Sequence, residues 1–201
     1  MKKIILLVIL ISIIACKKEE SVKEEPGVMD AVENLNNLSK VTDVLKNYEK
    51  RVEELKKLQP VKKEVYKEIL LEQLGDLKRT DYSVGDLTFG LNMGTATYGV
   101  DSKTVKVTIF DGAGETGSGL VYLTFITLSM DKESVNGTTT EKTEDIDGIR
   151  CLTKSTIDPD YVSSVITFIH NERFQITFDG SQIGLEELKK YVKQLDLSKL
   201  K

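Results

Sequence analysis

Few side chains in this chain could act as a nucleophile or a general base. The sequence contains two cysteines, Cys16 and Cys151, and a single histidine, His170. Cysteine catalysis needs a thiolate with a base beside it, but Cys151 stands in a strand-like run, where a lone cysteine is usually a small buried apolar residue. His170, the only candidate base, lies beside a predicted turn. The sequence therefore nominates no catalytic residue and favours a non-enzymatic protein.

Carboxylates are the other groups that could do hydrolytic chemistry or bind a metal ion. The aspartates considered for these roles are Asp111, Asp145, Asp147 and Asp179. They are too widely spaced in the sequence to nominate the pair that general acid–base catalysis requires. The run 145–148 has part of the spacing of a calcium loop, but the remaining oxygen ligands are missing, and the run 158–160 could hold a cation at a loop tip. Aspartates in such runs more often form turns, so we predict no metal site.

The residues before Cys16 indicate a different role for this cysteine. Two lysines precede the largely apolar run 4–14, which is shorter than the roughly 20 residues that span a bilayer and has the layout of a secretory signal. The sequence Ile13-Ile14-Ala15-Cys16 resembles a bacterial lipobox, which implies that residues 1–15 are a lipoprotein signal peptide and that Cys16 carries the lipid. A short membrane anchor, or a signal peptide cleaved at Ala15 without lipid, is the alternative.

Lipid on Cys16 would place the protein in the bacterial cell envelope. Several acyl chains on one residue give stable membrane attachment, and we expect attachment to the outer membrane. The run 16–20 resembles the lysine-then-acidic tag of Bacteroidota lipoproteins that reach the cell surface, although it also fits an ordinary charged tether. The periplasmic and the surface face of the membrane therefore both stay open.

The run 112–117 matches the G-x-G-x-x-G pattern of dinucleotide-binding proteins. In those proteins the glycines let the backbone approach a pyrophosphate at a helix N-terminus, directly after the first strand of a βαβ unit. Here the preceding strand is the third of a predicted antiparallel meander, and an exported protein meets little soluble dinucleotide. We therefore interpret the glycines as residues that tighten a loop, and we predict no cofactor.

Composition and charge limit the partners further. The chain has 28 basic and 32 acidic side chains, a formal net charge of −4, and no tryptophan. Nucleic-acid binding needs a clustered positive surface, and stacking of bases needs aromatic side chains. We predict no nucleic-acid partner; the expected contacts are with the membrane, through the lipid, and with another envelope protein.

Two segments are predicted before the folded domain. Residues 16–27 are rich in Lys and Glu and have almost nothing to bury, which is typical of a flexible tether. Residues 28–59 carry apolar side chains three or four positions apart, which predicts a long amphipathic helix that ends before Pro60. We favour a helix that lies along its own domain. The alternative is a stalk or coiled coil through which the protein binds a partner.

Residues 61–201 are predicted to form one α+β domain. A second amphipathic helix covers 61–77, and three alternating segments (84–89, 96–100 and 105–109) predict an antiparallel meander.

The apolar run 120–130 is ambiguous between helix and strand, and we assign it as a helix that crosses the sheet. The polar run 135–147 is a surface loop or an edge hairpin. The last elements are a strand at 149–155, a hairpin of 161–170 with 173–178, and a closing helix at 183–195. The expected fold is one antiparallel sheet of about five to six strands with helices packed on it, behind the long N-terminal helix.

From about residue 61 onward the chain also resembles an uncharacterised domain of bacterial lipoproteins and exported proteins. The resemblance rests on the strand end 107–111 with Gly112 and Gly114, on Asp147-Gly148, on the run 171–174 and on the tail 195–200. The layout is similar to that of PsbP and Mog1-like sandwiches. The family brings no known catalytic residue, so the resemblance implies none here.

Two functions fit these observations. The favoured one is a lipid-anchored, non-enzymatic module that binds a protein or assists an assembly. The alternative is a small-ligand carrier or envelope enzyme with a pocket between the sheet and segment 120–130, into which polar groups such as Asp111 and His170 would converge.

Overall fold

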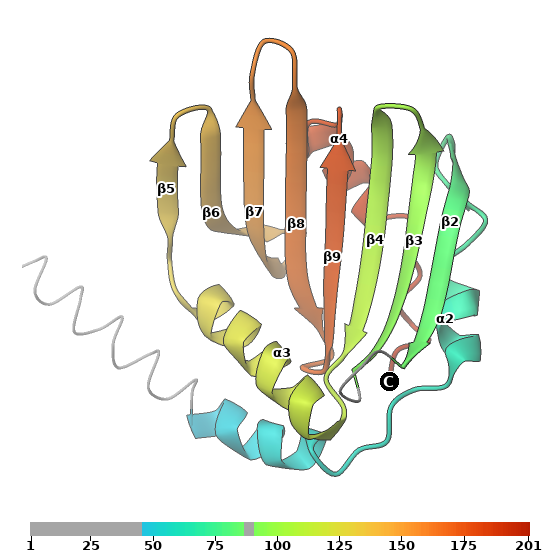
Figure 1. The fold of residues 1–201 in the computed structure, drawn as a ribbon. Helices are drawn as coiled ribbons and strands as arrows, with labels where there is room; N and C mark the ends of the chain where they lie inside the picture. The colour runs from blue at the N-terminus through green and yellow to red at the C-terminus, as the bar shows by residue number, and fades with distance from the viewer. Residues whose placement is uncertain (1–45, 87–90) are drawn as a thin grey trace, which may run out of the picture.

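The computed structural model describes residues 46–86 and 91–201, and this part of the chain forms one nine-stranded antiparallel sheet with helices on both faces (Figure 1). The strands are β1 (Gln73–Leu74), β2 (Leu77–Asp86), β3 (Asn92–Val100), β4 (Lys103–Asp111), β5 (Glu133–Asn136), β6 (Thr139–Ile146), β7 (Ile149–Ile157), β8 (Val162–His170) and β9 (Phe174–Ser181). The helical residues are 46–55, α2 (Lys63–Ile69), α3 (Gly114–Ser129) and α4 (Leu185–Val192).

The sheet consists of two meanders that meet in its middle. Its strand order is β1-β2-β3-β4-β9-β8-β7-β6-β5, so α3 carries the chain from β4 in the middle to β5 at the edge. The chain then returns strand by strand until β9 pairs with β4. In this central pairing Val107 lies opposite Phe178 and Ile109 opposite Ile176. Because side chains alternate along a strand, these apolar residues share one face of the sheet.

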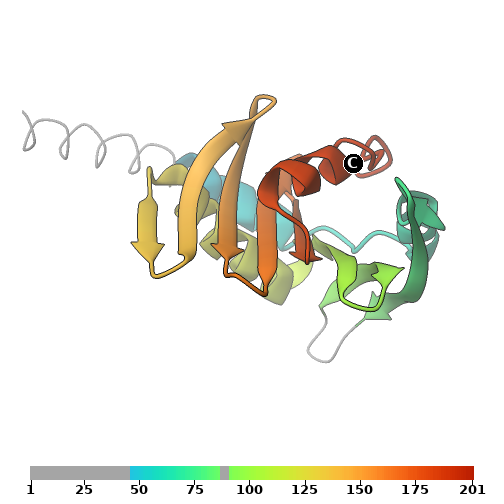
Figure 2. The same ribbon diagram turned by 90° about the horizontal axis from the view of Figure 1, so that it is seen from above.

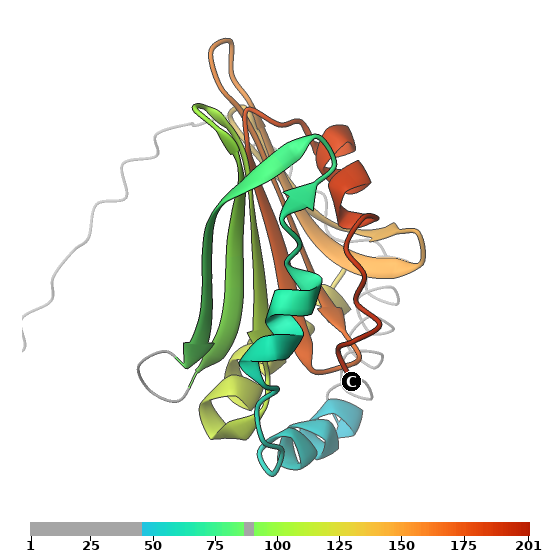
Figure 3. The ribbon, with the colours of Figure 1, turned by 90° about the vertical axis from the view of Figure 1, so that its right-hand side faces the viewer.

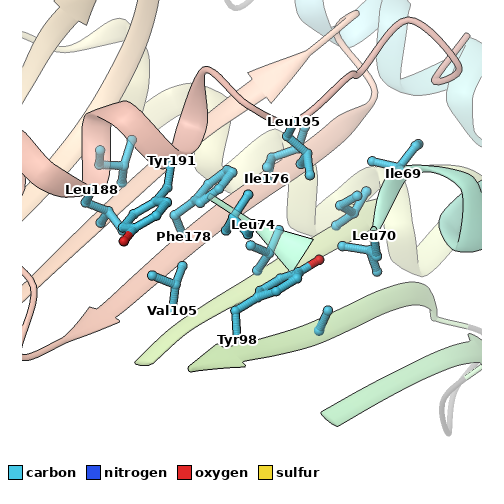
Figure 4. Packing of buried hydrophobic residues seen from close by; sticks show 14 of the residues in the cluster. Ile69, Leu70, Leu74, Tyr98, Val105, Ile176, Phe178, Leu188, Tyr191 and Leu195 are labelled. Carbon is cyan, nitrogen blue, oxygen red and sulfur yellow. The ribbon is translucent and has the colours of Figure 1, made fainter. Parts of the chain in front are cut away.

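The main core lies on the concave face of this curved sheet. Figure 2 shows α4 inside the curve, and Figure 3 shows α2 and α4 on the opposite side of the sheet from α3. Leu188 and Tyr191 of α4 face Phe178 of β9 (Figure 4), and these three side chains are at most 5% exposed. These side chains pack α4 against the centre of the sheet.

A smaller core lies on the other face. It is built around three buried residues, Tyr48, Phe110 and Val121, which come from helix 46–55, β4 and α3. Half-buried apolar side chains surround them, among them Val52 and Phe125. This second core holds α3 and helix 46–55 together at one end of the sheet (Figure 1).

The predicted fold, with about five to six strands in its antiparallel sheet, is wrong in the size of the sheet, because the described residues form nine strands. The strands that were not counted are β1, β5 and β6. β1 has only two residues, which is too short to show a pattern. β5 and β6 carry mostly polar residues, so these two strands lack the apolar alternation of a half-buried strand. Polar edge strands are a common protection against pairing with other molecules. The run 135–147 was accordingly an edge hairpin rather than a loop.

The predicted helix 61–77 is also wrong in its second half. α2 ends at Ile69, and Leu74 pairs with Leu77 in the β1–β2 turn instead of lying on a helix face. Gly75 makes this tight turn with a φ of +63°, a conformation that glycine adopts without steric cost. Of the predicted helix 28–59, residues 46–55 are helical, whereas residues 28–45 lie outside the described residues.

Three other predicted elements are confirmed. The ambiguous run 120–130 belongs to the helix α3, which begins earlier, at Gly114. The hairpin of β8 and β9 pairs as expected, with His170 opposite Phe174. The closing helix forms as α4, although it is shorter than predicted.

A buried ion pair lies where β4 ends. Asp111 is fully buried and Arg173 is 7% exposed. Arg173 Nε donates to Asp111 Oδ1 over 2.7 Å, and Nη2 donates to Oδ2 over 2.9 Å. The same carboxylate accepts hydrogen bonds from the backbone N–H groups of Val61 and Ala113 over 2.8 and 2.9 Å. Both charges are therefore paired and hydrogen-bonded, as buried charges must be.

The remaining donors of Arg173 bind distant parts of the chain. They reach the carbonyl of Gln59 over 3.0 Å and that of Lys201 over 3.2 Å. The carbonyl of Arg173 accepts from Gly112 N over 2.9 Å. One side chain thus joins the linker after helix 46–55, the corner between β4 and α3, the β8–β9 turn and the C-terminus.

Asp111→Asn should lower the free energy of unfolding by about 3 kcal/mol or more, because it leaves a buried guanidinium without its counter-charge. Chemical denaturation followed by circular dichroism measures this change. Lys193→Ala is the control, since Lys193 and Asp147 form an exposed pair, each side chain being 59% exposed. Equal denaturation midpoints for Asp111→Asn and Lys193→Ala would contradict this account.

Candidate functional site

An apolar groove of about 610 Å³ lies between the second half of α3 and the adjoining ends of β7 and β8. We call it the α3 groove. Its lining residues are Phe125, Leu128, Ser129, Gly148, Ile149, Arg150, Ile169 and Glu172. Apolar side chains from the helix and the two strands make up most of this lining, and the charged groups belong to Arg150 and Glu172. The volume is in the range of small-molecule and side-chain binding pockets.

The composition of α3 explains why an apolar surface remains uncovered here. The helix has one charged residue, Glu115, in its first turn. Val121 packs against the sheet and is fully buried, while Leu123 is 60% exposed and Leu120 is 41% exposed. A helix that is apolar on all sides cannot bury every face against one sheet. Its remaining surface is available to another element.

Helix 46–55 already covers part of that surface. Tyr48 is 2% exposed, and its ring stacks on Phe125 with centroids 3.7 Å apart and on Tyr122 with centroids 5.8 Å apart. Its hydroxyl donates to the carbonyl of Glu172 over 3.5 Å. Burial, together with the charge of Glu172, raises the pKa of the Tyr48 hydroxyl, which stays protonated. Because Phe125 and Glu172 also line the α3 groove, the groove is adjacent to the place where this helix packs.

Arg150 fixes one wall of the groove. Its Nε donates to the carbonyl of Leu128 over 3.1 Å and its Nη2 donates to that of Met130 over 3.2 Å. Nη2 also pairs with the carboxylate of Asp131. A cation at these last carbonyls stabilises the C-terminal end of α3. Arg150 therefore holds the end of α3 against β7, and with Glu172 it forms a polar rim around an apolar floor.

Cys151 does not have the environment of a reactive thiol. The side chain is 2% exposed, and burial with the nearby charges of Glu144 and Asp145 raises the pKa of the Cys151 thiol to about 12. His170 and Cys151 line a separate hollow of about 260 Å³ on the concave face. Burial lowers the pKa of His170, despite hydrogen bonding that involves the backbone of Leu197 and Leu200. Cys16, the predicted lipid attachment site, lies outside the described residues.

The aspartates considered from the sequence do not come together. Asp111 is held by Arg173. Asp145 Oδ2 lies 3.8 Å from Arg150 Nη1, and Asp147 Oδ2 lies 2.9 Å from Lys193 Nζ. Asp179 is exposed on β9. Within residues 46–86 and 91–201, no three His, Cys, Asp or Glu side chains are placed to hold a metal ion.

The glycine run 112–117 forms a tight corner between β4 and α3. A Cβ on Gly112 would lie 2.6 Å from the carbonyl oxygen of Arg173, and one on Gly117 would lie 2.8 Å from that of Asp111. Both distances are too short for any side chain. These two glycines are therefore needed for close packing of the strand end, the helix and the β8–β9 turn.

The sequence indicates this surface only in part. The alternative interpretation placed a pocket between the sheet and segment 120–130, and an apolar groove is present there. Neither Asp111 nor His170 lines it, however. The residues that do line it come from three distant segments, so spacing alone could not assemble them. The one available signal was the absence of charge along α3.

No protein-family model matches this chain, and no curated protein or solved structure is significantly similar to it. The resemblance to a domain of bacterial lipoproteins therefore stays a prediction. In the part of the chain that the structure describes, none of the helices has the length and apolar character needed to cross a membrane.

The environment of Cys151 makes its reactivity predictable. In the native protein at pH 8 the thiol should react with iodoacetamide far more slowly than a model thiol, because the thiolate is the reacting species and a thiol with a pKa of about 12 is almost entirely protonated. Mass spectrometry of the labelled protein, with the denatured protein as control, measures the rates. Equal rates in the native and denatured states would contradict the prediction.

Proposed function

We propose that this protein is a non-enzymatic binding module of the bacterial envelope, anchored by lipid on Cys16, which receives an amphipathic helix of a protein partner in the α3 groove. The observation that carries the proposal is the groove itself, an apolar floor with a polar rim beside a helix that already packs on α3. Neither the buried thiol of Cys151 nor the histidine His170 lines the groove. Among the described residues, no side chains are grouped to hold a metal ion.

The shape of the surface favours a helix as the ligand. Recognition of an amphipathic helix uses apolar side chains spaced three or four residues apart, laid into an apolar groove. Helix 46–55 packs on α3 in this way through Tyr48 and Val52, which are four residues apart. An apolar centre with a charged rim, here Arg150 and Glu172, is also typical of protein interfaces.

A small apolar ligand is the second candidate, and the volume of the groove favours it. About 610 Å³ is enough for a ligand of drug-like size. Native mass spectrometry of the purified protein distinguishes the two functions, because a carrier would retain a small bound molecule. That bound mass should disappear when Ile149, in the groove, is replaced by Glu.

The lipid anchor is tested by Cys16→Ala. This variant should appear in the soluble fraction, because the acyl chains supply the membrane affinity. Fractionation of cells with detection of the protein measures the distribution, and mass spectrometry of the native N-terminus identifies the lipid. If Cys16→Ala stays in the membrane fraction, the anchor is wrong.

The groove is tested by a photo-crosslinking amino acid at Ser129 in the lipidated full chain. Irradiation of cells should give an adduct with a second protein. Ile149→Glu should abolish that adduct, because a carboxylate would lie in the apolar floor. Ile157→Glu is the matched control, since Ile157 is 66% exposed in the β7–β8 hairpin and does not line the groove. An adduct that is unchanged in Ile149→Glu would rule out the groove as the binding site.

A further inference from the structure

The solvent-facing side of α3 carries no charged side chain. Val121 and Leu128 are buried, whereas Leu123 is 60% exposed and Leu120 and Met130 are each 41% exposed. The three exposed residues are three and seven positions apart, which places them on one side of the helix. With Thr127, which lies between them on the same side, we call these residues the outer face of α3.

The outer face also presents few groups that need water. The hydroxyl of Thr127 donates to the carbonyl of Leu123 over 3.1 Å, so its hydrogen bond is made within the helix. A Cβ on Gly119, beside Leu120, would meet no atom within 4 Å, which shows that this side of the helix is open. The solvent side of a surface helix is normally charged or polar. The outer face is therefore suited to an apolar surrounding.

The length of α3 limits how such a helix could meet a lipid bilayer. Its 16 residues span about 24 Å. The hydrocarbon core of a bilayer is roughly 30 Å thick, so α3 is too short to cross it. A helix with one apolar side can instead lie in the plane of the interface, with that side between the headgroups and the acyl chains.

The chain enters the described structure next to α3. Tyr48 stacks on Phe125, and Val52 lines a small hollow together with Tyr122, so helix 46–55 lies along α3. Both helices lie at the end of the sheet that is farther from the β3–β4 and β7–β8 hairpins (Figure 1). A lipid on Cys16 would be joined to this end of the domain, and tethering raises the effective concentration of a neighbouring surface at the bilayer.

The charge beside α3 is also compatible with an anionic membrane. The whole chain is acidic, but in residues 46–57 five basic side chains stand against three acidic ones. The basic residues are Lys46, Lys50, Arg51, Lys56 and Lys57, and the acidic ones are Glu49, Glu53 and Glu54. Basic residues close to a membrane surface are attracted by anionic lipids.

We propose that the outer face of α3 rests on the lipid bilayer, with Leu120, Leu123 and Met130 at the boundary between headgroups and acyl chains. This inference rests on the lipid anchor of the proposed function, because three apolar side chains alone give little membrane affinity. Phe125 and Leu128, which line the α3 groove, lie on a different side of the helix. The groove therefore stays accessible to a partner while α3 contacts lipid.

A single introduced tryptophan tests the contact, because the chain has none of its own. The mature chain is coupled through Cys16 to a maleimide lipid and bound to vesicles of phosphatidylethanolamine and phosphatidylglycerol. Cys151 does not compete for the maleimide, since its thiol is buried. The emission of Leu123→Trp should shift to shorter wavelength and be quenched by brominated acyl chains.

Ile157→Trp is the matched control for this measurement. Ile157 is 66% exposed in the β7–β8 hairpin, at the far end of the sheet. Its tryptophan should show neither the shift nor the quenching. Equal quenching of the two tryptophans, or no quenching of Leu123→Trp, would overturn the proposal.

The contribution of the outer face to membrane affinity is a second readout. One variant replaces its exposed apolar residues: Leu120→Ser, Leu123→Ser and Met130→Ser. The control replaces apolar residues that are 48 to 66% exposed elsewhere: Leu71→Ser, Val100→Ser and Ile157→Ser. With one acyl chain, whose own binding is marginal, the first variant should bind vesicles at least about tenfold more weakly than the control. Equal binding of the two variants, both folded by circular dichroism, would overturn the proposal.

These experiments separate the lipid contact from the native anchor, because the lipid on Cys16 is supplied chemically. If Cys16→Ala stays in the membrane fraction of cells but Leu123→Trp is quenched on vesicles, the native anchor is wrong and the contact of α3 with lipid holds. A soluble Cys16→Ala together with an unquenched Leu123→Trp keeps the anchor and removes the lipid contact.

A second copy of the chain is the other candidate to cover the outer face. Sedimentation equilibrium without vesicles tests it, and we expect the uncoupled chain to be monomeric. Dimers that disappear in the triple variant of Leu120, Leu123 and Met130 would overturn the proposal, because the outer faces would then cover each other.

Discussion

The ion pair between Asp111 and Arg173 is the interaction on which the arrangement of this protein depends. Asp111 ends the central strand β4, and Arg173 stands in the turn before β9, its neighbour in the sheet. Their side chains reach the linker at Gln59 and Val61 and the C-terminal Lys201. A buried ion pair contributes little net stability over an apolar substitute, but losing one partner is costly. The pair therefore acts chiefly by fixing where distant segments lie.

The position of the α3 groove follows from the contacts of this ion pair. Gly112 and Gly117 allow α3 to leave β4 through a tight corner against the carbonyl of Arg173. The linker held by the same guanidinium brings helix 46–55 back under α3, where Tyr48 meets Phe125. At the other end of α3, Arg150 holds the last carbonyls against β7. Contacts at both ends of α3 therefore set where its apolar surface lies on the sheet.

The sequence predicts the parts of this fold that carry strong periodicity. In the hairpin of β8 and β9, residues 174–179 of β9 alternate apolar and polar, β8 is rich in β-branched and aromatic residues, and the two strands pair as expected. The helix α3 was assigned correctly although its residues favour strand on propensity. The strand count failed because β5 and β6 are held by backbone pairing, β5 with β6 and β6 with β7, which needs no apolar alternation in their own residues. The prediction of a helix at Leu74 was wrong for a related reason. A buried leucine fits a helix face and a two-residue strand equally well.

The candidate site was less predictable than the fold, and the reason is physical. The residues considered from the sequence were those with reactive groups, and two of these groups have internal roles: Asp111 neutralises Arg173, and Cys151 fills the core. Cys16, the nominated lipid site, lies outside the described residues. The groove is instead defined by apolar residues such as Phe125, Leu128 and Ile149, which sequence reasoning assigns to the core by default. What distinguishes a groove from a core is the number of elements packed over it. Helix 46–55 covers only one part of the apolar face of α3, and the α3 groove is a part of that face that the described residues leave uncovered.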